Sequence, residues 1–302
     1  MGVQQVILWF CLLATSLTTP AFAQNLGWAP PNTVKVDSNL YIDRTEAANV
    51  HWLEFLYYAR KDSSSTFYKS MWPDTSVTRT FGVQDYLLHK DYRYHPVVGI
   101  SYTQAKAYCQ WRSMVVSKIY NHSDSVRAIL GLTTHDSLAV VYRLPTVDEW
   151  EAAAQANLSP KVYPYGLKTA FTPFPKEWNA TFLFDKRLNK TLNKKEFTKA
   201  YKGLRKKKVI PTFISAVLVE DLFAYYYSSP VYIYGGTQNS WGLYNMPGNI
   251  AEMVETEGLA KGGSFIHSIE KSQTQGFLVY SGPEMWLGFR CVAEIKVYST
   301  GK

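Results

Sequence analysis

The spacing of apolar residues predicts a short strand followed by an α-helix in the stretch 40–61. Val50, Leu53 and the pair Leu56 and Tyr57 recur at intervals of three to four, which places them on one face of a helix. The polar run Asp62–Ser65 that comes next is typical of a loop. We therefore expect a strand, a helix and a loop, in that order, near the start of the folded chain.

Two further helix starts carry a capping box. Ser101 is followed three residues later by Gln104, and Thr146 is followed at the same distance by Glu149. Such pairs satisfy the free amide groups of the first helical turn, because each side chain accepts a hydrogen bond from the other residue's backbone. Helices are therefore predicted to begin just after Ser101 and Thr146.

The remaining pattern predicts a single α+β domain with many loops. The stretch 66–94 is irregular and rich in aromatic residues, while 259–268 and 287–298 are predicted to contain late strands. No internal repeat and no linker between two domains is found in the sequence. Helices and strands in mixed order, without a repeat, favour one layered α+β unit.

The first residues are typical of an export signal. An apolar run, Val6–Leu17, precedes the small-residue site Ala21–Ala23, which predicts a signal peptide over residues 1–23. The run is short for a membrane span, and Cys11 lacks the small neighbours of a lipoprotein cysteine. We expect a polar extension over 24–40, a domain over 41–302, and a location in the periplasm or on the periplasmic face of the outer membrane.

Two cysteines, Cys109 and Cys291, remain after removal of the signal peptide. An exported protein meets an oxidising compartment, which favours a disulfide between them over two buried free thiols.

The net charge of +8 is concentrated in one segment, 185–208. This segment has a net charge of about +9, and we expect it to be a basic insertion in the domain. Its last basic run could bind phosphate groups, acidic lipid or an acidic protein face, although a solvated surface insertion is the alternative. The candidate partner face is Arg205, Lys206, Lys207 and Lys208. Nucleic acid is not an expected partner of an exported protein.

Common catalytic motifs are absent from the sequence. The six histidines show no HExxH spacing, and no GxSxG, P-loop or GxGxxG pattern occurs. The sequence therefore gives no support to a zinc hydrolase, to acyl transfer or to nucleotide and dinucleotide chemistry.

Seven short segments, in order, resemble the formylglycine-generating enzyme (sulfatase-modifying factor) family. They are TEAANVHWLEFL (45–56), HPVVGISYTQAKAYCQW (95–111), YRLPTVDEWEAAAQ (142–155), YPYG (163–166), WGLYNMPGNIAEM (241–253), KGGSF (261–265) and LGFRC (287–291). The resemblance implies an α+β domain related to the C-type lectin fold, with little regular secondary structure. It also implies the Cys109–Cys291 bridge.

The resemblance further implies a degenerate active site. Catalytic members of the family oxidise a substrate cysteine to formylglycine with a copper ion held by two thiolates just after the GGS motif. Soft thiolates suit Cu(I), but His267 and Ser272 stand at the two positions here. We therefore expect no copper and no oxidase activity, with an enzyme of altered metal chemistry as the alternative.

The family also uses structural calcium, which prefers oxygen ligands. The resemblance makes Asn249 and Glu252 candidate ligands for one ion, and Asn179 and Asp221 candidates for a second. The alternative for each is a side chain that caps a turn.

Three functions remain open at this point. The first is a non-catalytic scaffold or interaction subunit of an envelope machine, similar to the gliding-motility and type IX secretion lipoproteins (GldK, PorK and GldJ) of Bacteroidota. The chain departs from these in being shorter and in lacking a convincing lipobox. The second is a peptide- or glycan-binding module, and the third is the altered enzyme. The candidate groove residues are Ser264, His267, Ser272, Trp286 and Arg290.

Overall fold

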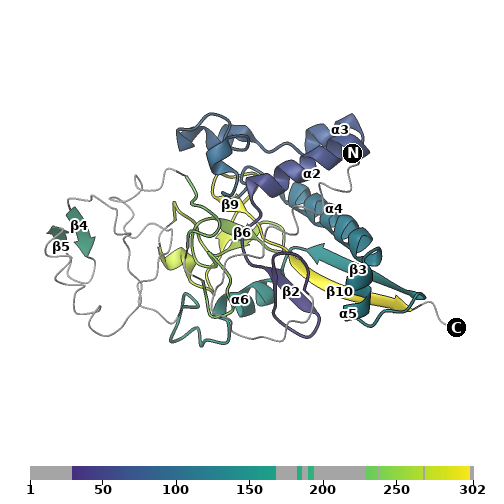
Figure 1. Ribbon diagram of the computed structural model, residues 1–302. Coiled ribbons are helices and arrows are strands. Elements are labelled where there is room, and N and C mark those ends of the chain that lie inside the picture. The colour runs from purple at the N-terminus through teal and green to yellow at the C-terminus, as the bar shows by residue number, and fades with distance from the viewer. Residues whose placement is uncertain are drawn as a thin grey trace.

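The two ends of the folded chain meet in one antiparallel sheet (Figure 1). The computed structural model describes residues 29–167, 182–185, 190–193, 229–236, 238–267 and 269–299. The sheet has the order β1-β2-β10-β3, so the last strand lies between strands from the first half of the chain. Its strands are β1 (Thr33–Lys35), β2 (Leu40–Asp43), β3 (Asp136–Arg143) and β10 (Val292–Ser299). The sheet thus begins inside the predicted extension 24–40.

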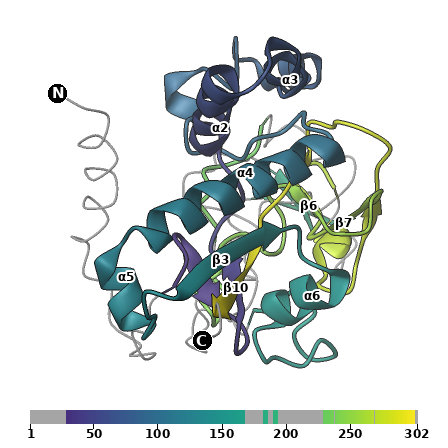
Figure 2. The same ribbon diagram turned by 90° about the vertical axis from the view of Figure 1, so that its right-hand side faces the viewer.

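Helix α4 (Tyr102–Asn121) lies along the edge of β3 that no other strand of the sheet pairs with (Figure 2). Three of its side chains, spaced four residues apart, accept hydrogen bonds from alternate backbone amides of the strand. The pairs are Tyr142 N to Ser113 Oγ at 2.8 Å, Val140 N to Ser117 Oγ at 2.9 Å and Leu138 N to Asn121 Oδ1 at 2.8 Å. Four residues of a helix rise about 6.0 Å, and two residues of a strand rise about 6.6 Å. Every fourth residue of α4 therefore lies next to every second residue of β3. The edge amides are thereby satisfied without another strand.

Helix α2 (Asn49–Asp62) forms where the apolar spacing predicts it, but its buried face is different. Trp52, Phe55, Leu56 and Ala59 are buried, whereas Val50 and Leu53 are only partly buried. The apolar face predicted from the sequence therefore differs from the buried face of α2 by a rotation of about one residue around the helix axis. The reason is the aromatic content: Trp52 stacks on Tyr108 of α4 at a centroid distance of 5.7 Å, and such large rings decide which face turns inward.

A second four-stranded sheet carries the later motifs. It has the order β8-β7-β6-β9, with β6 and β9 parallel and the other pairs antiparallel. Its strands are β6 (Ala251–Met253), β7 (Leu259–Lys261), β8 (Leu278–Val279) and β9 (Leu287–Gly288). These short strands place the GGS segment after β7 and the GFR segment at β9.

The other elements are short, in keeping with a fold of little regular secondary structure. They are α3 (Ser65–Ser70), α5 (Asp124–Ile129), α6 (Val147–Gln155), the hairpin β4 (Phe182–Asp185) and β5 (Lys190–Asn193), and 3-10 turns at Thr75–Phe81, Lys90–Tyr92 and Ile269–Ser272. Both predicted capping boxes are confirmed, at the starts of α4 and α6.

Several predicted features lie outside the described residues. They are the signal peptide 1–23, most of the basic insertion 185–208 with Arg205–Lys208, and the calcium candidates Asn179 and Asp221. Among the helices that the structure does describe, none has both the length and the apolar character needed to cross a membrane.

Candidate functional site

The GGS segment turns sharply at two glycines that no other residue could replace without strain. Gly262 and Gly263 have φ angles of +89° and +67°, which L side chains rarely adopt. A Cβ atom on Gly262 would lie 2.7 Å from the backbone oxygen of Met246, and one on Gly263 would lie 2.4 Å from Ser272 Oγ. The turn is therefore required both by backbone conformation and by close packing.

His267, which the resemblance places at the first thiolate position, is held in place by its neighbours. Its Nδ1 atom lies 2.6 Å from Ser264 Oγ, and its ring meets Trp286 edge to face at a centroid distance of 4.8 Å. Burial, with a smaller contribution from the charge of Lys271, lowers the pKa of His267 to about 4. The imidazole is therefore neutral near pH 7.

Ser272, which the resemblance places at the second thiolate position, packs on the same turn and is fully buried. Its Oγ atom has no hydrogen-bond partner among the described residues. His267 thus contacts Ser264, and Ser272 packs against Gly263. A neutral imidazole and a hydroxyl do not fit a Cu(I) site that needs two thiolates.

Arg290 is a core residue and not part of a ligand groove, which corrects the prediction. Its guanidinium forms a bidentate ion pair with Glu252, with two contacts of 2.6 Å, and both side chains are 0% exposed. Trp150 Nε1 donates to the same carboxylate at 2.7 Å. The remaining Arg290 donors bond the carbonyls of Asp43 and Tyr244. The pair ties the start of β10 to β6 and α6.

The predicted groove is consequently smaller than expected. Ser264, Ser272 and Arg290 are all 0% exposed, while His267 and Trp286 are only partly buried. Of the five candidate residues, only this ring pair can therefore offer a surface to a ligand.

Asn249 and Glu252 do not fit a calcium site. The Asn249 Oδ1 atom accepts a 2.8 Å hydrogen bond from Val231 N, and its amide donates to Glu46 Oε1 at 2.8 Å. The Glu252 oxygens face the permanent charge of Arg290, which would repel a cation. Within the described part of the chain, no group of three or more His, Cys, Asp or Glu side chains could hold a metal ion.

Glu46 and Lys261 are among the buried ionisable residues that the sequence analysis did not indicate. Glu46 is fully buried and accepts hydrogen bonds from Asn245 and Asn249, and burial raises its pKa to about 7. Lys261 is almost fully buried and pairs with Glu151 at 2.5 Å. In the sequence, Glu46 precedes two alanines and Lys261 precedes two glycines. Small neighbours of this kind are not enough to predict that a charged side chain is buried.

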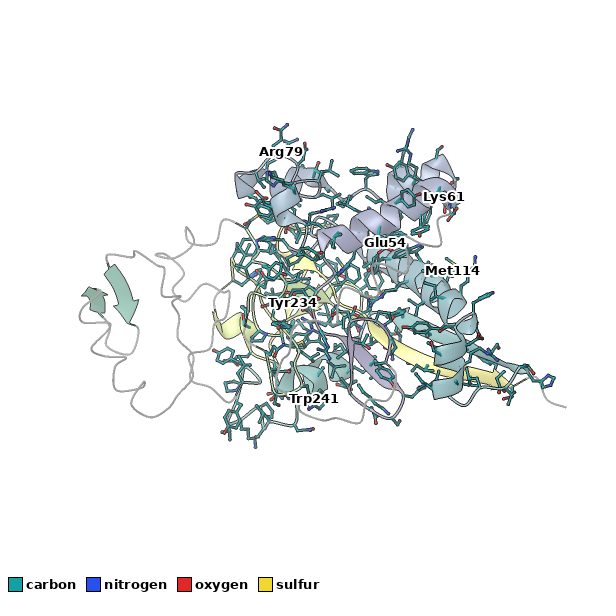
Figure 3. All side chains as sticks on the ribbon, in the orientation of Figure 1. Glu54, Lys61, Arg79, Met114, Tyr234 and Trp241 are labelled. Atoms are coloured by element: carbon teal, nitrogen blue, oxygen red, sulfur yellow. The ribbon has the colours of Figure 1, made fainter. Side chains whose placement is uncertain are left out.

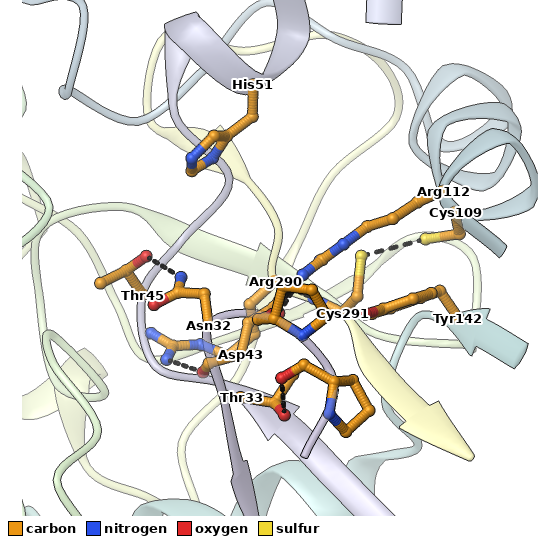
Figure 4. Close-up of polar contacts among 12 residues, drawn as sticks. Asn32, Thr33, Asp43, Thr45, His51, Cys109, Arg112, Tyr142, Arg290 and Cys291 are labelled. Atoms are coloured by element: carbon orange, nitrogen blue, oxygen red, sulfur yellow. Dashed lines mark hydrogen bonds and ion pairs between the residues drawn. The ribbon is translucent and has the colours of Figure 1, made fainter. Parts of the chain in front are cut away.

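Cys109 and Cys291 meet in the core as free thiols (Figure 4), and the disulfide between them stays a prediction. Their Sγ atoms lie 3.3 Å apart, against about 2.05 Å in a disulfide. Burial raises the pKa of the Cys291 thiol well above its usual value. Cys291 N donates to Asp43, whose carboxylate pairs with Arg112 at 2.6 Å.

The chain belongs to the sulfatase-modifying factor family. The family profile described as sulfatase-modifying factor enzyme 1-like domain matches residues 14–295, which is most of the chain. This assignment agrees with the mixed helices and sheets and with the position of the GGS turn after β7.

Three solved structures are similar to the chain at low sequence identity. CarF is 17% identical with a TM-score of 0.45, covering 85% of this chain and 87% of its own. PvdO from Pseudomonas aeruginosa is 16% identical with a TM-score of 0.44, covering 84% and 80%. Treponema denticola variable protein 1 is 14% identical with a TM-score of 0.43, covering 88% and 92%.

Proposed function

We propose that this protein is a non-catalytic scaffold or interaction subunit of a bacterial envelope machine, of the type IX secretion or gliding-motility kind. It is exported to the periplasm or to the periplasmic face of the outer membrane, and it reaches that membrane through protein partners. Structural calcium would have to be bound by residues other than Asn249 and Glu252.

The residues at the two expected thiolate positions, His267 and Ser272, support this proposal most strongly. His267 contacts Ser264 and Trp286, and Ser272 is buried against the glycine turn. The two cysteines of the mature chain lie elsewhere and contact each other. A copper oxidase of the family's kind would need two thiolates at these positions, and neither residue supplies one.

A ligand-binding module is the second candidate. The partly buried pair His267 and Trp286 favours it, because an aromatic face beside a neutral imidazole can contact a sugar ring or a peptide side chain. Binding of a glycan or peptide array that is lost in Trp286→Ala would support this candidate.

Cross-linking and affinity purification of the full chain from the cell envelope test the scaffold proposal. We expect stable envelope protein partners, and we expect that replacing Arg205–Lys208 by alanine weakens recovery if the basic segment is the partner face. Failure to recover any stable partner would overturn the scaffold role. Stoichiometric copper or iron in the purified protein, by elemental analysis, would instead favour an enzyme of altered metal chemistry.

A further inference from the structure

An apolar groove runs along the junction of α2 and α4, and no residue of the GGS turn lines it. It encloses about 710 Å³ and is lined by side chains of these two helices and of α3. A volume of this size is typical of binding sites. Its apolar lining includes Phe55, Tyr58, Ala59, Phe67, Trp111 and Met114.

The floor of the groove is aromatic and its rim is exposed. Trp111 packs against Phe55 at a centroid distance of 5.4 Å and against Tyr58 at 5.9 Å. Met114 stands at the rim with 66% of its surface exposed, on the outer face of α4 (Figure 3). Rigid aromatic rings beside a flexible methionine are the composition of protein-binding hot spots.

The shape of the groove favours a helix as its occupant. Along α4 and its C-terminal capping residue, the lining positions recur every three to four residues over about 22 Å. They include Ala107, Trp111, Met114, Lys118 and His122. This length accommodates roughly four turns of a second helix. Both long walls are helices, so the groove offers no open strand edge on which an extended peptide could add a strand.

The charge around the groove favours an acidic partner. Arg60 and Lys61 of α2 and Lys106 and Lys118 of α4 are exposed basic residues, against the acids Glu54 and Asp62 of α2; among these six, Asp62 and Lys118 line the groove. Helix α4 contains no Asp or Glu at all. A second copy of the chain would bring like charges together at this face, which disfavours a symmetric dimer.

We propose that the α2–α4 groove binds a short amphipathic helix of another protein, whose apolar stripe enters the groove and whose flanking residues are acidic. This inference does not depend on the proposed function, because an active member of the family could carry the same groove.

Titration of the full chain with two synthetic helices tests the proposal. Both are 16-residue peptides with leucine at the i, i+3, i+4 and i+7 positions, one with glutamate and one with lysine on the flanks. The glutamate helix is expected to bind more tightly. Met114→Asp should weaken its binding by about 10-fold or more, because a charge would then enter the apolar contact. Lys118→Glu should weaken it by about 2- to 5-fold and improve binding of the lysine helix.

The matched control is Ile129→Asp. Ile129 is 62% exposed on α5 and does not line the groove, so its replacement should leave binding unchanged. The proposal is overturned if neither helix binds at about 1 mM, if both bind equally, or if Met114→Asp has no effect. It is also overturned if vesicles of phosphatidylglycerol displace the peptide through the same residues, or if sedimentation shows that Met114→Asp abolishes a dimer.

Discussion

At the scale of single residues, Gly263 is the point of the GGS turn against which Ser272 packs. Gly263→Ala should destabilise the protein more than Gly82→Ala, although both glycines have positive φ angles. A Cβ atom on Gly82 meets nothing within 4 Å, so that variant reports only the backbone cost of about 1–2 kcal/mol. The clash with Ser272 should add about 1–3 kcal/mol. Urea unfolding measures both, and equal losses would mean that the turn is not packed against Ser272.

His267 gives the site a predictable pH dependence. Its pKa is about 4 in the folded protein and about 6.5 in an unfolded chain. The unfolded chain therefore takes up this proton at higher pH, so the stability that His267 contributes is complete above about pH 6.5 and is lost as the pH falls through 4. The advantage of wild type over His267→Gln in free energy of unfolding should shrink over that window. A folded-state pKa near 6.5 by NMR would contradict this.

At the scale of elements, α4 replaces a missing strand at the edge of β3. Ser117→Ala should leave the buried Val140 N–H without a partner, at a cost of about 1–3 kcal/mol. Hydrogen exchange of the Val140 amide should accelerate more than that of Leu138, which keeps its bond to Asn121. Ser125→Ala, on the exposed face of α5, is the control. Equal exchange at both amides would show that Ser117 does not protect the edge.

Local features of these elements could be predicted from the sequence, and long-range ones could not. The caps at Ser101 and Thr146 are confirmed because a capping box involves only neighbouring residues. The buried face of α2 was misplaced because Trp52 takes its position from Tyr108, a contact made by another helix. The place of β10 between β2 and β3 is likewise set by partners distant in sequence.

In the candidate site, too, local features could be predicted from the sequence and long-range contacts could not. The glycine turn could be located from its sequence, whereas the assignment of His267 and Ser272 to thiolate positions stays a prediction from the resemblance. Arg290 and Glu252 were misassigned because only the fold shows that each neutralises the other in the core. An isolated acid or arginine in a sequence does not reveal such a partner.

At the scale of the whole molecule, the Cys109–Cys291 contact joins α4 to the segment before β10. We expect the two thiols to form a disulfide under oxidising conditions, which would close a loop of more than 180 residues and stabilise the protein by about 4–5 kcal/mol. Intact mass measured with and without reductant reports the bond, and urea unfolding reports the gain. A Cys109→Ser/Cys291→Ser variant, insensitive to reductant, is the control. Two alkylatable thiols after oxidation would contradict the prediction.

Anaerobic Cu(I) titration against a chromophoric chelator tests the central claim, that the family's loop is retained without its ligands. We predict that wild type takes up no stoichiometric Cu(I), whereas His267→Cys/Ser272→Cys takes up about one equivalent, because two thiolates suit this ion. Both proteins are compared in a Cys109→Ser/Cys291→Ser background, so that the core pair cannot contribute. One equivalent of Cu(I) bound by the chain with His267 and Ser272 in place would contradict the account.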